Sequence, residues 1–375
     1  MLTFTDIEYS PEYRYNIVVN ATALTSGGGL SILQQFIDHV PAKGIYYIFI
    51  DSRSPVQTNS ANIHLIKIDI HGWIKRFFWD ARGLKIYLKA KNIVADVLIS
   101  LQNTAVCYDK NAKNILYLHQ AIPLHQKKWS FFKKTERKLA FYKYVYPWFI
   151  FLHANKYTKV IVQTHWMKKS LCEKFNRLES NIYVIRPDIM RVDVGSIKKI
   201  DLAPKHILFY PASGMAFKNH KEIIHALYAL KNNDYDMSSI ALFITIHEYD
   251  NPDLLKLIHA LGLRSNVHFL GMISYDDVLV YYKSCSIVVF PSYIESFGLP
   301  LLEAAMFGKP LVVMDADYSR EVISNYPQVI FAPQNSPDIW MHAILTALSQ
   351  TQFNSYQPAY ESNWNDFFCL IQNDF

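Results

Sequence analysis

The segment 285–313, which reads CSIVVFPSYIESFGLPLLEAAMFGKPLVV, constrains the fold of this chain more than any other stretch. Its apolar run 287–290 is typical of a strand that is buried on both faces. Pro300 favours the first turn of a helix, because proline has a fixed φ and needs no partner there for its missing N–H. Gly308 and Pro310 then end the helix before a second apolar strand. The segment therefore predicts a strand, a loop, a helix and a second strand.

The loop and the first helical turn contain the residue types of an anion site and a sugar site. Around residues 298–301 the backbone N–H groups lack intrahelical partners and can point at a phosphate. Gly298 lets the main chain approach such a ligand closely. Glu295 and Glu303 flank this position, and ionised carboxylates only accept hydrogen bonds, for example from paired sugar hydroxyls. Together these features indicate a nucleotide sugar; alternatively, Glu303 is a solvated helix residue and Glu295 a loop charge.

The two glutamates also carry a resemblance to a known family. The string ESFGLPLLE resembles the E-x7-E signature of retaining glycosyltransferases with the GT-B fold, and most of all family 4, glycosyltransferase group 1. Residues 205–315 carry the resemblance strongly and residues 15–185 loosely. It implies an α/β chain with two Rossmann-like domains that face each other across a cleft. It also implies transfer of a sugar from a nucleotide diphosphate sugar to a hydroxyl with retained configuration, as in bacterial polysaccharide or lipopolysaccharide assembly.

The resemblance places the donor site in the second half of the chain. It implies that Glu303 binds the ribose hydroxyls and that Glu295 contacts the sugar ring. Lys218 matches the lysine with which the family neutralises the donor pyrophosphate; alternatively, it is a free surface lysine. The other donor contacts implied by the match are Phe297, Gly298 and Leu299.

The sequence departs from the family pattern at one position. The arginine that usually precedes the lysine falls near Ser213 and is missing. Lys221, Arg186 or water could take over part of its work, and the sequence leaves these alternatives open. The acidic triplet 315–317 lies after the donor motif, and no Asp-x-Asp motif occurs in a suitable loop. We therefore predict no metal and no cofactor, since the nucleotide sugar is a substrate.

A glycine triplet near the start of the chain precedes a predicted helix over about residues 30–39. A strand, a glycine turn and a helix together allow close approach to a phosphate. In the resembled family such a loop lines the acceptor side of the cleft near the donor phosphates, which assigns Gly28 and Gly29 to the site. The alternative is a dinucleotide fingerprint in which Asp51 reads a ribose, but its third glycine falls at Ile32.

His119 stands at the end of a predicted strand in YLHQAIPLH. A side chain there faces the usual ligand crevice of an open α/β sheet. The alternative is a packed histidine that the backbone satisfies. Members of the resembled family often carry a histidine in this context close to the donor sugar. On that basis His119 is a candidate catalytic residue that contacts the sugar or the developing charge.

Residues 125–155 combine lysines and arginines with many aromatic residues, and the shorter stretch 73–91 is similar. This composition is typical of an amphipathic helix that binds a membrane surface. RNA binding needs the same residue types, but no RRM, KH or helix-turn-helix signature occurs, so we predict no nucleic acid. The alternative is that the aromatics are core and the lysines solvated. Residues 1–200 carry 29 Lys and Arg against 14 Asp and Glu, whereas residues 201–375 carry 9 against 18. We therefore predict a lipid-linked saccharide acceptor at an anionic inner membrane face.

The length of the chain predicts two domains. The resemblance implies an acceptor-side domain over 1–187, a connection over 188–204, a nucleotide-sugar-binding domain over 205–355, and a helix in 356–375 that returns to the first domain. The four scattered cysteines are expected to be reduced, buried thiols. No signal-peptide pattern and no apolar run of about 18 residues occurs, which predicts a cytoplasmic protein with at most peripheral membrane contact.

Three rival classes remain open at this point. A nucleotide-sugar epimerase with the GT-B fold converts the donor without an acceptor. An NAD-dependent oxidoreductase binds NAD and changes its absorbance. A non-catalytic nucleotide-sugar-binding protein retains its ligand without transfer.

Overall fold

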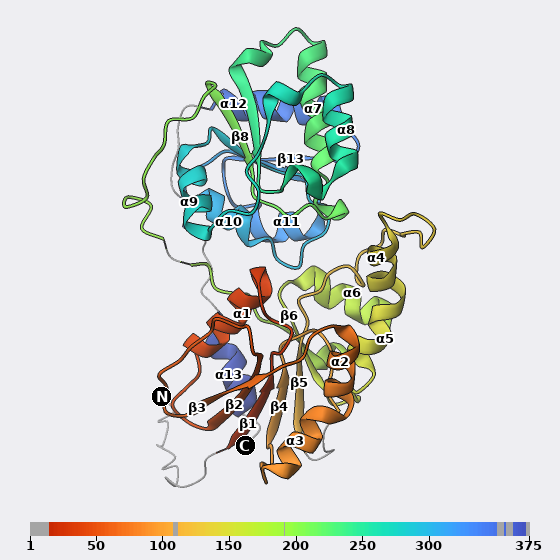
Figure 1. Cartoon of the computed structure of the whole chain (residues 1–375). Coiled ribbons are helices and arrows are strands. Elements are labelled where there is room, and N and C mark those ends of the chain that lie inside the picture. Colours follow the sequence, from red (N-terminus) through yellow and green to blue (C-terminus); the bar gives the residue numbers. More distant parts are fainter. Residues whose placement is uncertain (1–14, 108–111, 191, 351–355, 358–362, 373–375) are drawn as a thin grey trace, which may run out of the picture.

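The computed structural model has two α/β domains stacked end to end, joined by a long connection (Figure 1). It describes residues 15–107, 112–190, 192–350, 356–357 and 363–372. Each domain is built on one parallel sheet, and strands such as β4 (Val97–Ser100) and β11 (Ile287–Phe290) are buried along their whole length. Uninterrupted apolar strands are expected where helices cover both faces of a parallel sheet. This architecture confirms the prediction of two Rossmann-like domains.

The first sheet has seven strands in the order β3-β2-β1-β4-β5-β6-β7. Its strands are β1 (Asn16–Asn20), β2 (Ile45–Asp51), β3 (Ile63–Ile68), β4, β5 (Lys113–Tyr117), β6 (Lys159–Val162) and β7 (Ile182–Val184). The helical segments around it are α1 (Gly27–Asp38), α2 (Trp73–Phe78), η1 (Trp79–Gly83), α3 (Leu84–Ala90), α4 (Arg137–Ala140), η2 (Phe141–Val145), α5 (Tyr146–Phe151), α6 (His165–Phe175) and η3 (Glu179–Asn181).

The second sheet has six strands in the order β10-β9-β8-β11-β12-β13. Its strands are β8 (His206–Tyr210), β9 (Ile240–Ile244), β10 (Val267–Phe269), β11, β12 (Leu311–Met314) and β13 (Val329–Ala332). The helical segments that follow the connection are η4 (Ala216–Lys218), α7 (His220–Asn232), η5 (Met237–Ser239), η6 (Glu248–Asp250), α8 (Pro252–Ala260), η7 (Arg264–Asn266), α9 (Tyr275–Ser284), α10 (Leu299–Met306), α11 (Asp317–Ile323), α12 (Pro337–Leu348) and α13 (Trp364–Gln372).

The helix α13 returns to the first domain, as predicted, and lies beside its sheet in Figure 1. The Trp364 ring stacks on Tyr117 of β5 with a centroid separation of 5.7 Å and an interplanar angle of 9°. Phe36 of α1 meets the rings of both Trp364 and Phe367 edge-on. These aromatic side chains belong to the core cluster of the first sheet. Burying them stabilises the chain's return, because each large ring contributes about 2 kcal/mol when removed from water.

Three predicted elements differ in detail from the structure. The helix α1 begins at Gly27 rather than near residue 30, so the glycine triplet forms its first turn. The stretch 73–91, whose composition is typical of an amphipathic helix, is interrupted between α2 and α3 by the π-helical segment η1. The basic aromatic segment 125–155 is no single amphipathic helix: it is irregular as far as Glu136 and then continues as α4, η2 and α5.

Candidate functional site

The loop between β11 and α10 is called the donor loop here and comprises residues 291–298. Gly298 has φ +95°, which other residues rarely adopt, and a Cβ there would lie 3.3 Å from Cε2 of Tyr318. Glycine is therefore required where the loop turns into α10. The Tyr318 hydroxyl donates to the Ser292 carbonyl (2.5 Å), and the Tyr293 N–H donates to the Phe217 carbonyl (3.1 Å). The loop is thus a fixed structure whose last residue leads into a helix N-terminus.

The structure brings Lys218 and Glu295 together. The Lys218 Nζ lies 2.6 Å from Glu295 Oε1, and the two side chains are only 17% and 14% exposed. Lys218 stands at the end of η4, where the Tyr210 hydroxyl donates to its carbonyl at 2.7 Å. A largely desolvated ion pair interacts more strongly than a surface pair. Lys218 is therefore no free surface lysine, and the site contains one cation and one carboxylate in direct contact.

Glu303 lies in α10, about one turn beyond the start of the helix. Its carboxylate accepts hydrogen bonds from the hydroxyls of Tyr275 (3.2 Å) and Tyr282 (3.3 Å). Burial raises the pKa of Glu303 to about 7, although the two tyrosine hydroxyls act in the opposite direction. A solvated helix residue has no such environment, so the alternative interpretation of Glu303 is wrong. Phe297, by contrast, is buried in the core, which leaves only its backbone to contact a ligand.

In the first domain the structure places Gly29 beside His119. A Cβ at Gly29 would lie 3.8 Å from Cε1 of His119. Gly28, which precedes it in α1, is exposed. The imidazole Nε2 of His119 lies 3.1 Å from the Leu101 carbonyl and 3.0 Å from the Asn103 side-chain nitrogen. Burial lowers the pKa of His119 to about 4, so the ring is neutral at physiological pH. It can hold a hydrogen bond to a ligand but supplies no positive charge.

Behind His119 lies a buried polar network that sequence reasoning missed. The Asp80 carboxylate accepts hydrogen bonds from Asn20 (2.8 Å), Gln102 (2.7 Å) and Thr104 (2.8 Å). Burial raises the pKa of Asp80 to about 7, against the effect of these three donors. The network fixes the residues on either side of Asn103, whose side chain accepts from the His119 N–H at 2.6 Å. A lone aspartate in a helical stretch has no spacing that could have revealed this role.

The dinucleotide alternative does not fit the arrangement around Asp51. Its carboxylate is 1% exposed and pairs with Arg53 through two hydrogen bonds of 2.8 and 3.0 Å. This pairing lowers the pKa of Asp51. The acceptors that a ribose would need are therefore already used, and the glycine triplet lies inside α1 rather than in a turn before it.

The predicted residues form two groups, one on each domain. Lys218 and Glu295 make one group, and Gly29 and His119 make the other. Across the described residues, no hydrogen bond or ion pair joins the two groups directly. Both follow the carboxyl ends of parallel strands, where open α/β sheets bind their ligands. In Figure 1 the α1 end of the first domain faces the end of the second domain that carries α10 and α11.

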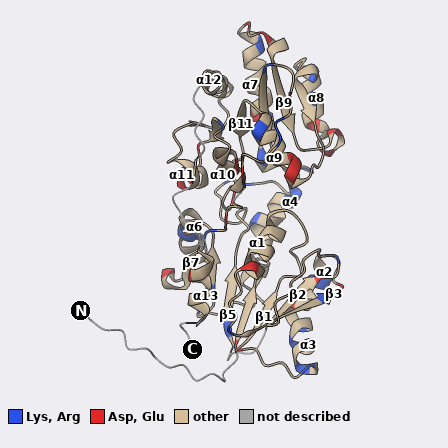
Figure 2. Cartoon of the chain, turned by 90° about the vertical axis from the view of Figure 1, so that its left-hand side faces the viewer, with Lys and Arg blue, Asp and Glu red and all other residues tan. Residues whose placement is uncertain are grey.

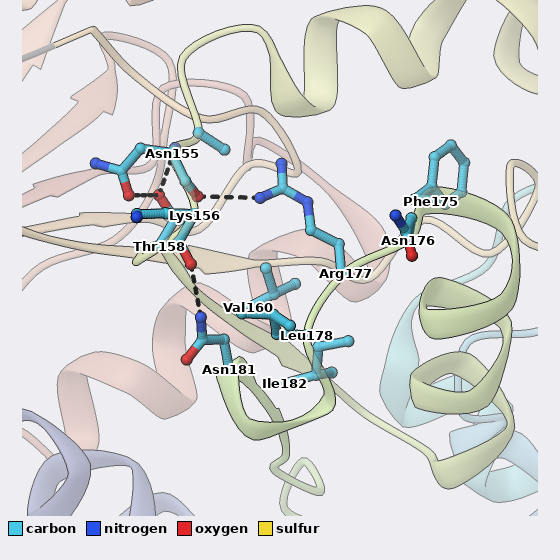
Figure 3. Close-up of a pocket in the computed structure, with 11 residues that line it drawn as sticks. Asn155, Lys156, Thr158, Val160, Phe175, Asn176, Arg177, Leu178, Asn181 and Ile182 are labelled. Atoms are coloured by element: carbon cyan, nitrogen blue, oxygen red, sulfur yellow. Dashed lines mark hydrogen bonds between the residues drawn. The ribbon is translucent and has the colours of Figure 1, made fainter.

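A surface cavity of about 360 Å³ lies elsewhere, at the amino ends of β6 and β7 (Figure 3). Its cations are already engaged: Arg177 donates to the Asn155 carbonyl at 3.0 Å, and Lys156 lies over the Tyr157 ring. The Asn181 side chain donates to the Lys156 carbonyl. This cavity is at the opposite strand ends from the predicted site and contains none of its residues.

Other features bear on earlier expectations. Within the described residues, His, Cys, Asp and Glu form no group of three that could hold a metal ion. The four cysteines are free, but Cys369 is exposed and Cys107 and Cys172 are only partly buried, so the expectation of buried thiols holds for Cys285 alone. In the part of the chain that the structure describes, no helix has the length and apolar character needed to cross a membrane.

Comparison with known proteins identifies the second half of the chain. Residues 196–362 match the family model described as "Glycosyl transferases group 1". This part of the chain is similar to the group 1 glycosyltransferases. The matched range contains both signature glutamates and Lys218, which confirms the resemblance stated from the sequence.

Individual relatives agree with this family. An uncharacterised glycosyltransferase of Methanocaldococcus jannaschii is 27% identical over 55% of this chain, and the chain spans about half, 56%, of that relative. The O-antigen chain mannosyltransferase RfbU of Salmonella typhimurium is 24% identical over 75% of this chain and 76% of RfbU. The crystal structure of WaaG, a glycosyltransferase of lipopolysaccharide biosynthesis, superimposes with a TM-score of 0.65 at 17% identity, covering 89% of this chain and 90% of WaaG. The likeness to WaaG confirms the GT-B fold.

Proposed function

We propose that the second domain acts with the first domain as a retaining glycosyltransferase in cell-surface polysaccharide or lipopolysaccharide biosynthesis. Its donor is a nucleotide diphosphate sugar. Its acceptor is a lipid-linked saccharide that binds on the side of the first domain. The observation that carries this proposal is the Lys218–Glu295 pair at 2.6 Å beside the N-terminus of α10. A cation and free helix N–H groups suit a diphosphate, and an adjacent carboxylate suits sugar hydroxyls.

The residues take the following roles in this proposal. Lys218 and the backbone N–H groups at Gly298 and Leu299 stabilise the negative charge that develops on the departing diphosphate. Glu303, between two tyrosines, accepts hydrogen bonds from the ribose hydroxyls. Glu295 accepts from the sugar ring, and neutral His119 contacts the sugar from the first domain. Because these groups offset the charge of the departing nucleotide diphosphate, we predict that the reaction needs no metal ion.

A thermal-shift screen of the purified protein against UDP-, GDP-, ADP- and dTDP-sugars, with NAD alongside, tests the proposed class. A ligand that binds only the folded state raises its stability, by about 2.7 kcal/mol at a hundredfold excess over Kd. We expect stabilisation by one nucleotide sugar and none by NAD. Stabilisation by NAD alone would contradict the proposal. Conversion of the bound sugar nucleotide in the absence of any acceptor would instead favour the epimerase.

We also propose that the first domain contacts an anionic membrane surface, where a lipid-linked acceptor is presented. The surface concerned is called the basic aromatic patch and comprises α2, α5 and residues 127–138. Phe132 is 94% exposed and Trp148 78% exposed, and Phe77 of α2 packs against Phe149 of α5. Figure 2 shows Lys and Arg on α2 and α3, whereas Asp and Glu gather on α8 and α9 of the second domain. Exposed rings among lysines are suited to the headgroup region of a bilayer.

Removing charge from the patch is expected to weaken binding to vesicles that contain anionic lipid. Lys128, Lys133 and Lys134 are exposed, and each lysine near an anionic surface contributes about 1 kcal/mol. Their joint replacement by glutamine should therefore lower the vesicle partition coefficient, obtained from the fraction of protein that sediments, by more than tenfold. Replacement of Lys256, which is exposed on α8 of the second domain, should change nothing. Full-strength sedimentation of the triple variant would show that the patch does not bind lipid.

A further inference from the structure

The first domain contacts the donor loop of the second domain through Thr164. This residue precedes α6 and is fully buried, and its hydroxyl donates to the carbonyl of Ser296 at 3.0 Å. Ser296 stands directly between Glu295 and Phe297 in the signature motif. A single threonine of the first domain therefore fixes the peptide next to the carboxylate that pairs with Lys218.

A second contact between the domains lies beside the first. The Glu321 carboxylate of α11 accepts from the backbone N–H groups of His165 (2.8 Å) and Trp166 (3.1 Å), and it lies 2.9 Å from the His165 Nδ1. These two N–H groups belong to the first turn of α6, where they have no partner inside the helix. A carboxylate at this position also interacts favourably with the helix dipole. The N-terminus of α6 in one domain is thus capped by a side chain of the other.

The helix α11 connects these two contacts mechanically. Tyr318 lies one turn before Glu321, and its hydroxyl donates to the Ser292 carbonyl at the start of the donor loop. The Tyr318 ring also lies against Gly298 at the end of the loop. Within α11, Tyr318 therefore contacts the donor loop, and Glu321 in the next turn contacts α6. In this arrangement of the two domains, Tyr318 of α11 holds the donor loop at both of the loop's ends, and Thr164 of the first domain holds it at Ser296.

We propose that Thr164 and Glu321 are positioning residues, which link the approach of the first domain to the placement of the donor loop. Neither residue needs to touch the donor. Thr164 orients the Ser296 peptide and with it Glu295, while Glu321 holds α6 so that Thr164 stays in reach. The consequence for catalysis rests on the proposed function of Glu295, whereas the consequence for the loop rests on these contacts alone.

Hydrogen–deuterium exchange of the purified full-length chain tests the link without any ligand. Thr164→Val keeps the shape of the side chain and removes the hydroxyl, whereas Thr164→Ser keeps the hydroxyl. One intramolecular hydrogen bond changes an opening equilibrium by up to about tenfold. We expect exchange of a peptide that covers residues 292–298 to be about tenfold faster in Thr164→Val and unchanged in Thr164→Ser. Glu321→Gln should speed exchange both there and in the first turn of α6.

Thr158→Val is the matched control, because Thr158 is also buried in the first domain but bonds to Asn155 at the far end of β6. That variant should leave exchange of the donor loop unchanged. Equal exchange in wild type and Thr164→Val would overturn the proposal, as would failure of the serine to restore slow exchange.

A thermal-shift measurement with the same UDP-, GDP-, ADP- and dTDP-sugar panel separates this inference from the proposed function. If no sugar nucleotide stabilises the wild type, the proposed function fails, while the exchange result still decides whether Thr164 positions the loop. If one does, Thr164→Val should bind it about tenfold more weakly and Thr164→Ser as well as wild type. Wild-type affinity in Thr164→Val would contradict positioning of the donor site.

Discussion

Replacing Lys218 by methionine is expected to lower kcat/KM for the nucleotide sugar by about 10²- to 10³-fold. The methionine retains a stem that can pack near the rings of Phe217 and Phe290, over which the Lys218 ammonium now lies. It removes the charge that stabilises the departing diphosphate. Because this charge develops mainly in the transition state, the loss should appear more strongly in kcat than in KM. Steady-state kinetics with the donor found in the thermal-shift screen measure both values.

The variant also leaves the Glu295 carboxylate without its partner, and this effect needs separating from catalysis. Removing one partner of a largely buried ion pair leaves an unpaired charge and destabilises the fold by about 3 kcal/mol. Lys218→Met combined with Glu295→Gln removes both charges, so its thermal stability should recover while its activity stays low. Lys256→Met, an exposed lysine on α8, serves as the surface control. Recovery of activity in the double variant would mean that Lys218 acts only as a partner of Glu295.

The strands on either side of the donor loop could be predicted because their cause is local. A buried parallel strand is a short apolar run, and β11 and β12 appear in the sequence as such runs on either side of a Pro- and Gly-bounded helix. The return of α13 to the first domain was expected from the resemblance to GT-B enzymes, and its apolar rings give the physical reason, because they must be buried. What it packs on, the Tyr117 ring of β5, could only come from the structure.

The contacts of the site depend on pairs far apart in the chain. Lys218 and Glu295 are 77 residues apart, and Thr164 and Ser296 are 132 apart. A sequence pattern can assign a residue type to a site, but it carries no distance between such segments. The predicted roles placed Lys218 on phosphate and Glu295 on sugar, and gave no reason to expect a direct ion pair.

The basic aromatic segment shows where composition misled the prediction of structure. Trp129 was counted among the aromatics of a surface helix, but it is 5% exposed and belongs to the core cluster of the second domain. Its neighbour Lys127 lies over the Tyr293 ring of the donor loop at 4.0 Å. Alternating lysines and aromatics are compatible with both a surface and an interface between domains, because each aromatic is buried or exposed according to tertiary packing. The aromatic side chains of this segment that are exposed and available to a membrane surface are Phe131, Phe132, Tyr144 and Trp148.

Donor affinity is expected to fall by about tenfold when the pH is lowered from 8 to 6, with a midpoint near 7. The pKa of Glu303 is raised to about 7 by burial, so its carboxylate changes from mostly ionised to mostly protonated over this range. Ribose hydroxyls donate to the ionised form, and binding is therefore favoured above the pKa and lost below it. Titration calorimetry with a nucleotide sugar measures this directly. A diphosphate sugar itself has no ionisation in the range, and His119 stays neutral because its pKa is about 4.

Two variants assign the pH dependence to Glu303 rather than to Asp80, whose pKa also lies at about 7. Glu303→Gln should bind with the weak affinity of the wild type at pH 6 and show little change up to pH 8. The Tyr275 hydroxyl donates to the Glu303 carboxylate and thereby lowers the pKa of that carboxyl. Tyr275→Phe removes this hydrogen bond and raises the pKa, so the midpoint should move to higher pH. A pH profile that persists unchanged in Glu303→Gln would place the titrating group elsewhere and exclude the ribose role of Glu303. A shift of the midpoint in Tyr275→Phe would show that donor binding depends on the ionisation of the Glu303 carboxylate, which lies between Tyr275 and Tyr282.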